Sequence, residues 1–285
     1  MTTYLVTGAS GHLGRLAVHA LLERGVAAGD VVAAARDTGA IADLADLGVQ
    51  TRTADYTDPA SLKEALAGAD RVLLVSSSAV GERVAQHAHV IEAAKDAGVE
   101  LLAYTSITGA DSSAMALAGE HRETEELLAA SGLPTVVLRN SWYLENYTGQ
   151  IATALEHGAV PSASGDGRVS AATRADYAAA AAAALVDGRA GLVLELGGDT
   201  AFTLAEYAAE LSAASGTEVV HRDLPAEELT AVLVGAGLPE PYAAVLADSD
   251  LGLARGELRT ESGDLSRLIG RPTTTVAEAI RAALA

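Results

Sequence analysis

The chain of 285 residues contains no cysteine and only one tryptophan and one phenylalanine. The absence of cysteine excludes disulfide bonds, thiolate catalysis and metal sites with cysteine ligands. No uninterrupted apolar run approaches the roughly 20 residues that a membrane-spanning helix requires. The N-terminus has no basic segment followed by an apolar one, as a secretory signal has. We therefore expect a soluble, cytoplasmic protein with no membrane partner.

Positive charge is also scarce. The formal net charge is −19 at pH 7, and lysine occurs only at Lys63 and Lys95. Such a chain repels a phosphate backbone, and no cluster of Lys and Arg offsets the repulsion, so we expect no nucleic-acid partner. His87 and His89 stand two residues apart, a spacing that points their side chains in different directions on a helix. No nearby acidic cluster completes a ligand set, and we expect no metal site.

Short aliphatic runs alternate with helical patterns from the N-terminus to about residue 139. The runs predict six strands, over residues 3–7, 31–35, 50–53, 71–75, 101–105 and 134–139. Strands that alternate with helices are typical of βαβ units on a parallel sheet. The predicted fold is therefore α/β, a Rossmann-type doubly wound parallel sheet with helices on both faces.

The pattern changes after residue 139. An aromatic-rich segment and a loop over residues 158–170 precede longer helices, and only residues 192–196 and 218–223 predict further strands. We expect two domains, over residues 1–140 and 141–285, of which the second is smaller, mixed and mostly helical; the chain is free to recross between them. The second domain would close a cleft at the carboxyl ends of the strands, where ligands of open α/β sheets bind.

The clearest motif is GASGHLG, which follows the first predicted strand and opens the first helix. Gly8 permits a tight turn, Gly11 lets the backbone approach a pyrophosphate, and Gly14 lets helix and strand pack closely. The helix N-terminus adds free N–H groups and the positive end of its dipole. Glycines also mark plain turns, but the strand before the motif and the helix after it favour a dinucleotide site.

The end of the second predicted strand bears on the choice of dinucleotide. An acidic residue at this point binds the ribose 2′-hydroxyl of NADH, whereas an arginine suits the 2′-phosphate of NADPH. Arg36 comes first here, with Asp37 behind it. This order favours NADPH. Asp37 leaves NADH open, and Arg36 has the alternative role of a solvated residue at a strand end.

Polar residues also follow the later strands, at the edge of the sheet where the rest of a dinucleotide would lie. Because turns are rich in Ser, Thr and Asp, none of these residues is decisive by itself. They are Asp55, Tyr56, Ser76, Ser77, Ser78, Thr105 and Ser106.

The glycine spacing resembles that of the short-chain dehydrogenase/reductase superfamily, whose catalytic pair is Tyr-x-x-x-Lys. That pair cannot form here, because Pro59 and Ile91 stand four residues before the two lysines. His121 and Glu125, four residues apart on one helix face, are an alternative acid and orienting group, or else an exposed ion pair. Reduction of a simple carbonyl benefits from a proton donor, whereas a quinone accepts hydride to give a delocalised oxyanion that solvent can protonate. The missing pair therefore favours a good hydride acceptor.

Longer motifs are similar to those of the NmrA-like group of atypical short-chain dehydrogenase/reductases, and within it to the bacterial type 2 NAD(P)H:quinone oxidoreductases. The resemblance covers essentially the whole chain. It is carried by VTGASGHLG, AYTSITGAD, AATRADYAAAAA and, with the greatest specificity, LRNSWYLENY and RPTTTVAEA. It implies NADPH on the first domain, flavin-free two-electron reduction of a quinone, and at most a homodimer.

The resemblance also implies roles for individual residues. Arg36 would bind the 2′-phosphate. Trp142, Tyr143 and Tyr147 would stack on a quinone ring, although an aromatic stretch after a strand is also typical of a core. Tyr143 and His121 are the candidates for a catalytic group. The residues for the pyrophosphate are Gly8, Ser10, Gly11, His12, Leu13 and Gly14; those for the ribose are Ser76, Ser77 and Ser78; those for the nicotinamide end are Asn140, Glu145 and Arg174.

Two functions from different classes fit these features. The first is an enzyme that passes hydride from NADPH to a quinone, or to an enone, nitro compound or azo dye, which an aromatic cleft would not separate. The second is a nucleotide sensor, since some NmrA-like proteins bind NAD(P) without catalysis and regulate a protein partner. The likeness of LRNSWYLENY to the oxidoreductase branch ranks the enzyme first.

Overall fold

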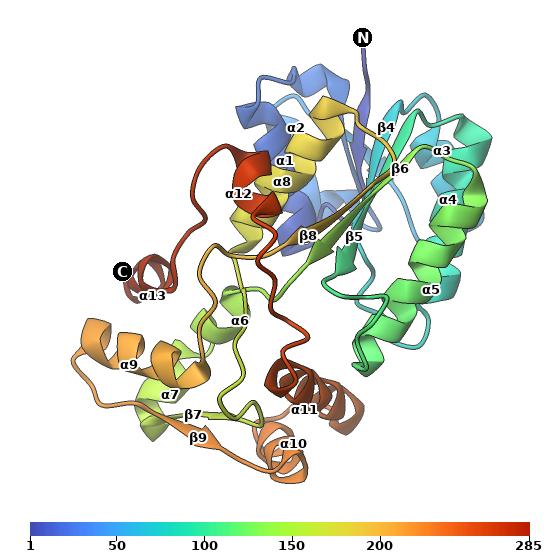
Figure 1. Cartoon of the computed structure of the whole chain (residues 1–285). Helices are drawn as coiled ribbons and strands as arrows, with labels where there is room; N and C mark the ends of the chain where they lie inside the picture. The colour runs from blue at the N-terminus through green and yellow to red at the C-terminus, as the bar shows by residue number, and fades with distance from the viewer.

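A seven-stranded parallel sheet organises the chain, and the computed structural model describes all 285 residues (Figure 1). Its strands are β1 (Tyr4–Val6), β2 (Val31–Ala35), β3 (Gln50–Thr53), β4 (Arg71–Leu74), β5 (Leu101–Ile107), β6 (Thr135–Asn140) and β8 (Leu192–Leu196). The strand order is β3-β2-β1-β4-β5-β6-β8, so the winding direction reverses between β1 and β4. The predicted doubly wound parallel fold is confirmed, and its switch point is where a ligand is expected to bind.

Helices cover both faces of this sheet (Figure 1). One face carries α1 (His12–Glu23), η2 (Thr38–Ile41), α2 (Ala42–Asp46), α8 (Arg174–Asp187) and α12 (Asp264–Ile269), and the other carries α3 (Pro59–Leu66), α4 (Arg83–Ala97) and α5 (Ala116–Ser131). A short 3₁₀ helix, η1 (Ala28–Asp30), leads into β2.

Alternate residues of β1, β2, β4, β5 and β6 enter the two hydrophobic clusters that these helices form. In β5, Leu101 and Ala103 face α1 and α8, while Leu102 and Tyr104 face α3 to α5. This is the period-2 alternation of a strand that is buried on both sides. Double burial also explains why these strands are largely aliphatic in the sequence, whereas β3, at the edge of the sheet, is polar.

The second part of the chain lies below the sheet in Figure 1 and has its own hydrophobic cluster. It contains β7 (Ala159–Ser162), β9 (Val220–Asp223), α6 (Glu145–Thr148), α7 (Ile151–His157), α9 (Leu204–Ser215), α10 (Ala226–Gly235), α11 (Glu240–Ala254) and α13 (Val276–Leu284). β7 lies within residues 158–170, which we expected to be a loop. It forms a strand because β9 pairs with it in parallel, beginning with Ala159 opposite Val220. The local sequence could not predict this strand, because its pairing partner is distant in the sequence.

Residues beyond 140 also return to the large sheet. β8 pairs with β6, and α8 packs against α1 and α12. Three elements that pack on or within the large sheet, β8, α8 and α12, therefore lie after the proposed division at residue 140. None of the helices combines the length and the apolar character needed to cross a membrane.

Candidate active site

The glycine motif forms a tight loop between β1 and α1, at the switch point of the sheet. Gly8 has a φ of +61°, a left-handed conformation that glycine adopts without strain. A Cβ on Gly14 would lie 2.7 Å from the carbonyl carbon of Gly8, so loop and helix touch backbone to backbone. α1 begins at His12 with no acidic side chain in its first turn. Its free N–H groups and dipole therefore favour an anion at this loop, as a pyrophosphate requires.

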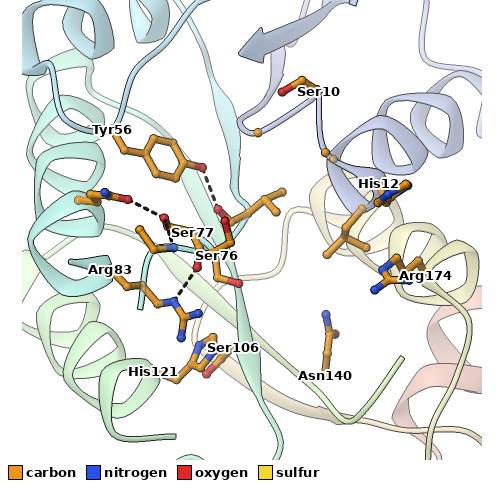
Figure 2. A pocket seen from close by; sticks show the side chains of 18 of the residues that line it. Ser10, His12, Tyr56, Ser76, Ser77, Arg83, Ser106, His121, Asn140 and Arg174 are labelled. Carbon is orange, nitrogen blue, oxygen red and sulfur yellow. Dashed lines mark hydrogen bonds between the residues drawn. The ribbon is translucent and has the colours of Figure 1, made fainter. Parts of the chain in front are cut away.

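The loop forms one end of a cavity of about 570 Å³ that extends to the aromatic segment after β6. Figure 2 shows Ser10 and His12 on one side of this cavity and Tyr56, Ser76 and Ser106 on the other. Most of the predicted site residues meet here, although they follow strands that are far apart in the sequence. Those that line the cavity are Gly8, Ser10, Gly11, His12, Leu13, Gly14, Arg36, Asp55, Tyr56, Ser76, Ser77, Ser78, Ser106, His121, Asn140, Trp142, Tyr143 and Arg174.

Three predicted residues, Thr105, Glu145 and Tyr147, do not line the cavity. Thr105 accepts a hydrogen bond from the Ser76 N–H at 2.9 Å and supports the loop after β4 from behind. Glu145 accepts the backbone N–H of Arg174 at 2.8 Å and fixes the start of α8. Both therefore lie behind residues that face the cavity.

Tyr147 departs furthest from its expected role. Its ring packs against Phe202 and Tyr207, with centroids 6.0 and 5.6 Å apart, beside the hydrophobic cluster of the second part. The structure does not place this ring where a ligand in the cavity could stack on it, because the side chain faces α9 instead. Burial raises the pKa of its hydroxyl well above the ordinary value.

Arg36 is exposed at the cavity edge and makes no hydrogen bond or ion pair within the protein. The Asp37 carboxylate accepts the Gly39 N–H at 2.8 Å, caps η2 and does not line the cavity. Hydrogen bonds from Thr57 lower the pKa of the nearby Asp55, and Arg36 contributes less. A free guanidinium next to a carboxylate that is turned away fits a 2′-phosphate better than a 2′-hydroxyl.

Buried groups of α4 and α5 hold the loop of Ser76, Ser77 and Ser78. The Ser77 N–H donates to His87 Nε2 at 2.9 Å, and His87 Nδ1 lies 3.0 Å from Thr124 Oγ1. Because Nε2 accepts, we assign the ring proton to Nδ1, which donates to Thr124. Burial lowers the pKa of His87 to about 3, so the imidazole is neutral near pH 7.

The other histidine of this pair, His89, faces away from His87. Its Nδ1 donates to the Tyr56 carbonyl oxygen at 2.9 Å. No group of three or more His, Cys, Asp or Glu side chains is placed to hold a metal ion. The two histidines of α4 are thus bound to the backbone and to a hydroxyl, in separate contacts.

His121 and Glu125 do not form the predicted pair. His121 Nδ1 lies 2.7 Å from the Tyr104 hydroxyl, whereas Glu125 binds the Arg139 guanidinium at 2.6 Å and accepts the Ser106 hydroxyl. His121 is buried and the Glu125 side chain is only 14% exposed, so the alternative of an exposed ion pair is also wrong. The four-residue spacing places two side chains on one helix face, but it does not show that this face meets β5 and β6.

The protonation of His121 follows from its surroundings. Burial lowers its pKa well below the ordinary value, with Arg83 and His87 adding to the effect, and burial raises the pKa of Tyr104. We therefore assign the bond as Tyr104 donating to Nδ1, which leaves the imidazole proton on Nε2. Nε2 has no hydrogen-bond partner in the protein and His121 lines the cavity. His121 is thus a neutral hydrogen-bond donor, not an acid that titrates near pH 7.

The far end of the cavity carries the aromatic segment. The Arg174 guanidinium lies 4.5 Å from the Tyr143 ring centroid, and the Tyr143 and Tyr177 rings form a T-shaped pair, so protein covers part of Tyr143. Trp142 has no such partner.

Asn140 also lies at this end of the cavity. It is 3% exposed, and its buried Oδ1 has no hydrogen-bond partner. A buried amide oxygen without a donor costs free energy, and the carboxamide of a nicotinamide would supply that donor.

The family model of NAD(P)H-binding proteins matches residues 8–187, which include the glycine loop, the serine loop and α8. The chain belongs to this NAD(P)H-binding family. Quinone oxidoreductase 2 of Escherichia coli is 48% identical over 276 residues, 96% of each chain. A crystal structure of the NADPH-dependent quinone oxidoreductase from Escherichia coli, complexed with NADPH, has a TM-score of 0.96 at 47% identity over 99% of this chain and 100% of that chain.

Two further solved structures resemble this NAD(P)H-binding protein. Triphenylmethane reductase of Citrobacter sp., complexed with NADP(H), is 36% identical with a TM-score of 0.94 over 99% of this chain and 100% of that chain. NmrA, a negative transcriptional regulator in complex with NAD, is 14% identical with a TM-score of 0.82 over 98% and 94% of the two chains, and shares the fold alone. The predicted relationship to NAD(P)H-binding quinone oxidoreductases is confirmed.

The sequence pattern did not single out several side chains of the cavity: Arg83 and Gln86 of α4, Leu117 of α5, Asn146 of α6 and Tyr242 of α11. Polar residues lie all round α4 and α5, so the pattern of neither helix shows which face meets the sheet. Asn146 lies within LRNSWYLENY, and this motif is the sequence signal that could have identified it. Tyr242 reaches the cavity only through the tertiary fold.

We expect His87→Gln to reduce the loss of stability at acid pH. The unfolded chain binds a proton on His87 near its ordinary pKa of 6.5, whereas the folded protein binds it only near pH 3. Because the unfolded state binds more protons in between, stability from this group is complete above pH 6.5 and falls as the pH falls toward 3. Urea unfolding at about pH 7.5 and about pH 5 measures the slope, and a variant with the wild-type slope would contradict the assignment.

Proposed function

We propose that the chain catalyses the two-electron reduction of quinones by NADPH, without flavin. The observation that carries the proposal is one continuous cavity that joins the glycine loop and Arg36 to the aromatic segment. The 48% identity to quinone oxidoreductase 2 of Escherichia coli over nearly the whole chain supports the same activity. When bound, NADPH supplies the hydride and its electron pair.

The cofactor side of the cavity has a residue for each part of the dinucleotide. The loop from Gly8 to Leu13 binds the pyrophosphate through backbone N–H groups, and Arg36 binds the 2′-phosphate. The loop of Ser76, Ser77 and Ser78 binds the ribose side. Asn140 and Arg174 would hold the nicotinamide end, and Asn140 Oδ1, which has no partner within the protein, would accept a hydrogen bond from the carboxamide. These contacts would orient the donor for transfer to the acceptor.

The acceptor side is mainly apolar and aromatic. Trp142 is the principal stacking surface, and Tyr143 contributes the part of its ring that Arg174 leaves free. The hydroquinone anion is weakly basic, so water protonates it and the missing Tyr-x-x-x-Lys pair is no obstacle. His121 donates a hydrogen bond from Nε2 and keeps its proton, since its depressed pKa keeps the imidazolium unpopulated near pH 7.

Anaerobic stopped-flow kinetics test this function. Flavin-free protein is mixed with NADPH and a simple benzoquinone, and the loss of dihydronicotinamide absorbance is followed against a protein-free blank. We expect rapid oxidation, and we expect Trp142→Ala to raise the KM for the quinone by roughly three- to tenfold with unchanged NADPH affinity. Protein that binds NADPH but oxidises it with no member of a quinone panel would refute the proposal.

The nucleotide sensor is the second function considered, and we do not favour it. Its support is the fold shared with NmrA at 14% identity. A sensor would bind NADPH and NADP⁺ with different affinities and consume neither, so the kinetic assay together with a binding titration separates the two. Enones, nitro compounds and azo dyes remain alternative acceptors, and the homodimer stays a prediction to be tested by light scattering.

A further inference from the structure

A buried arginine lies in the cavity wall beside the serine loop, across the cavity from Asn140. Arg83, the first residue of α4, is 5% exposed. Its Nε donates to the Ser77 carbonyl oxygen at 2.7 Å. Its Nη1 lies 3.5 Å from Glu120 Oε2, but the two atoms are not aligned for a hydrogen bond, and both are enclosed without a hydrogen-bond partner. Nη2 has no partner in the protein and is not among the enclosed atoms, so it is the part of the guanidinium that meets the cavity.

Arg83 does not stand alone. Figure 2 shows its guanidinium extending toward His121 and Ser106, on the wall opposite Asn140. Nε2 of His121 is a second donor without a protein partner, on a side chain that is also 5% exposed. The one carboxylate that lines the cavity is Asp55, at the end near Arg36. The wall by Arg83 therefore presents a cation and an N–H donor to the cavity. No carboxylate lines this part of the cavity.

Such a wall suits a negatively charged oxygen. Burying a guanidinium that leaves donors unused costs free energy, and a ligand oxygen that accepts from it recovers that cost. Donors that are fixed before the reaction and aimed at a developing charge are also an effective way to stabilise an oxyanion, because they need no reorganisation.

We propose that Arg83 and His121 form the site for the acceptor oxygen that becomes anionic during reduction, and this rests on the proposed function. The acceptor gains a hydrogen nucleus and two electrons from NADPH, which is thereby oxidised to NADP⁺. The two electrons leave one acceptor oxygen negative, next to the Arg83 guanidinium and the His121 N–H. Water then supplies the proton that completes the neutral hydroquinone.

The same site determines which acceptors are favoured. A quinone or an enone ends hydride transfer with negative charge on oxygen, which Arg83 stabilises. A triphenylmethane dye begins as a cation and ends neutral, so no negative charge develops for Arg83 to stabilise. Arg83 therefore makes this chain selective for acceptors that form an oxyanion over cationic dyes.

The first test needs no turnover. 4-Nitrophenol, whose anion is coloured, is titrated into protein saturated with NADP⁺, near the pH at which half of the free probe is ionised. We expect the wild type to bind the anion and increase the colour. Arg83→Gln, which keeps a donor for the Ser77 carbonyl, should bind the anion about tenfold or more weakly, and Arg83→Lys should retain part of the effect. Equal anion binding by wild type and Arg83→Gln would overturn the proposal.

The matched control is Arg122→Gln. Arg122 lies on the same helix as His121, is exposed and does not line the cavity, so the variant makes the same change in net charge. It should bind the nitrophenolate as the wild type does. An equal loss in both variants would mean that the effect is long-range charge and would overturn the assignment to Arg83.

The second test compares single-turnover hydride transfer to a neutral quinone and to a cationic triphenylmethane dye. Arg83→Gln should lower the quinone rate constant by about 10- to 100-fold, leave NADPH affinity within about threefold, and raise the ratio of dye to quinone rates. An equal fall with both acceptors, or a fall that follows lost NADPH affinity, would overturn the proposal. No turnover by the wild type with any quinone would instead refute the proposed function, while the nitrophenol titration would still report on the anion site.

Discussion

Gly14→Ala is expected to lower NADPH affinity by about 100-fold or more and to destabilise the protein by about 1–3 kcal/mol. The added Cβ would lie 2.7 Å from the carbonyl carbon of Gly8 and 3.1 Å from the Cα of Ala9, and both are backbone atoms. Loop and helix must therefore move apart. The phosphate then loses two or more hydrogen bonds to backbone N–H groups, each worth about 1.5–3 kcal/mol when the partner is charged. Nucleotide titration and urea unfolding measure the two effects.

Gly119→Ala is the matched control for this substitution. Gly119 lies within α5 and a Cβ there meets no heavy atom within 4 Å, so alanine should leave NADPH binding unchanged and raise stability slightly. If Gly14→Ala binds NADPH as tightly as the control, the loop is not the close-packed cradle that we describe.

Arg36→Ala is expected to reduce the preference for NADPH over NADH by about 10- to 100-fold, which corresponds to about 1.4–2.8 kcal/mol. The guanidinium has no partner within the protein, so its charge is free for the 2′-phosphate, and Asp37 is engaged with the Gly39 N–H. NADH has no such phosphate, and its kcat/KM should change little. The ratio of kcat/KM for the two cofactors is the measurement, with the exposed Arg281→Ala as a control of equal charge.

Two results would contradict the role of Arg36. One is an unchanged ratio, which would mean that another residue recognises the 2′-phosphate. The other is an equal fall with both cofactors, which would mean that Arg36 holds the loop rather than the phosphate. High salt should weaken the wild-type preference, because an exposed ion pair is screened.

The cofactor side of the site was predictable from the sequence because its residues are local to strand ends. Gly8, Gly11 and Gly14 are fixed by the strand before them and the helix after them. Arg36 directly follows β2, whose carboxyl end lies beside that of β1. Parallel strands bring their ends to one edge, so polar residues that follow them meet whatever the details of packing.

The acceptor side was predictable only in part. Trp142 and Tyr143 line the cavity as expected, whereas Tyr147 packs against Phe202 and Tyr207. An aromatic residue is equally suited to a core and to a ligand surface, and the sequence does not contain the direction of its side chain. β7 was missed for a related reason, since its hydrogen bonds come from a strand that is distant in the sequence.

The sequence by itself determined the doubly wound sheet, the glycine cradle, the arginine at the end of β2 and the absence of a Tyr-x-x-x-Lys pair. Each of these depends on neighbours within a few residues or on composition. Only the tertiary structure decided that His121 binds Tyr104 instead of Glu125, and that Arg83 joins it on the cavity wall. Helical spacing says which side chains share a face, but the packing of α4 and α5 on the sheet determines what that face meets.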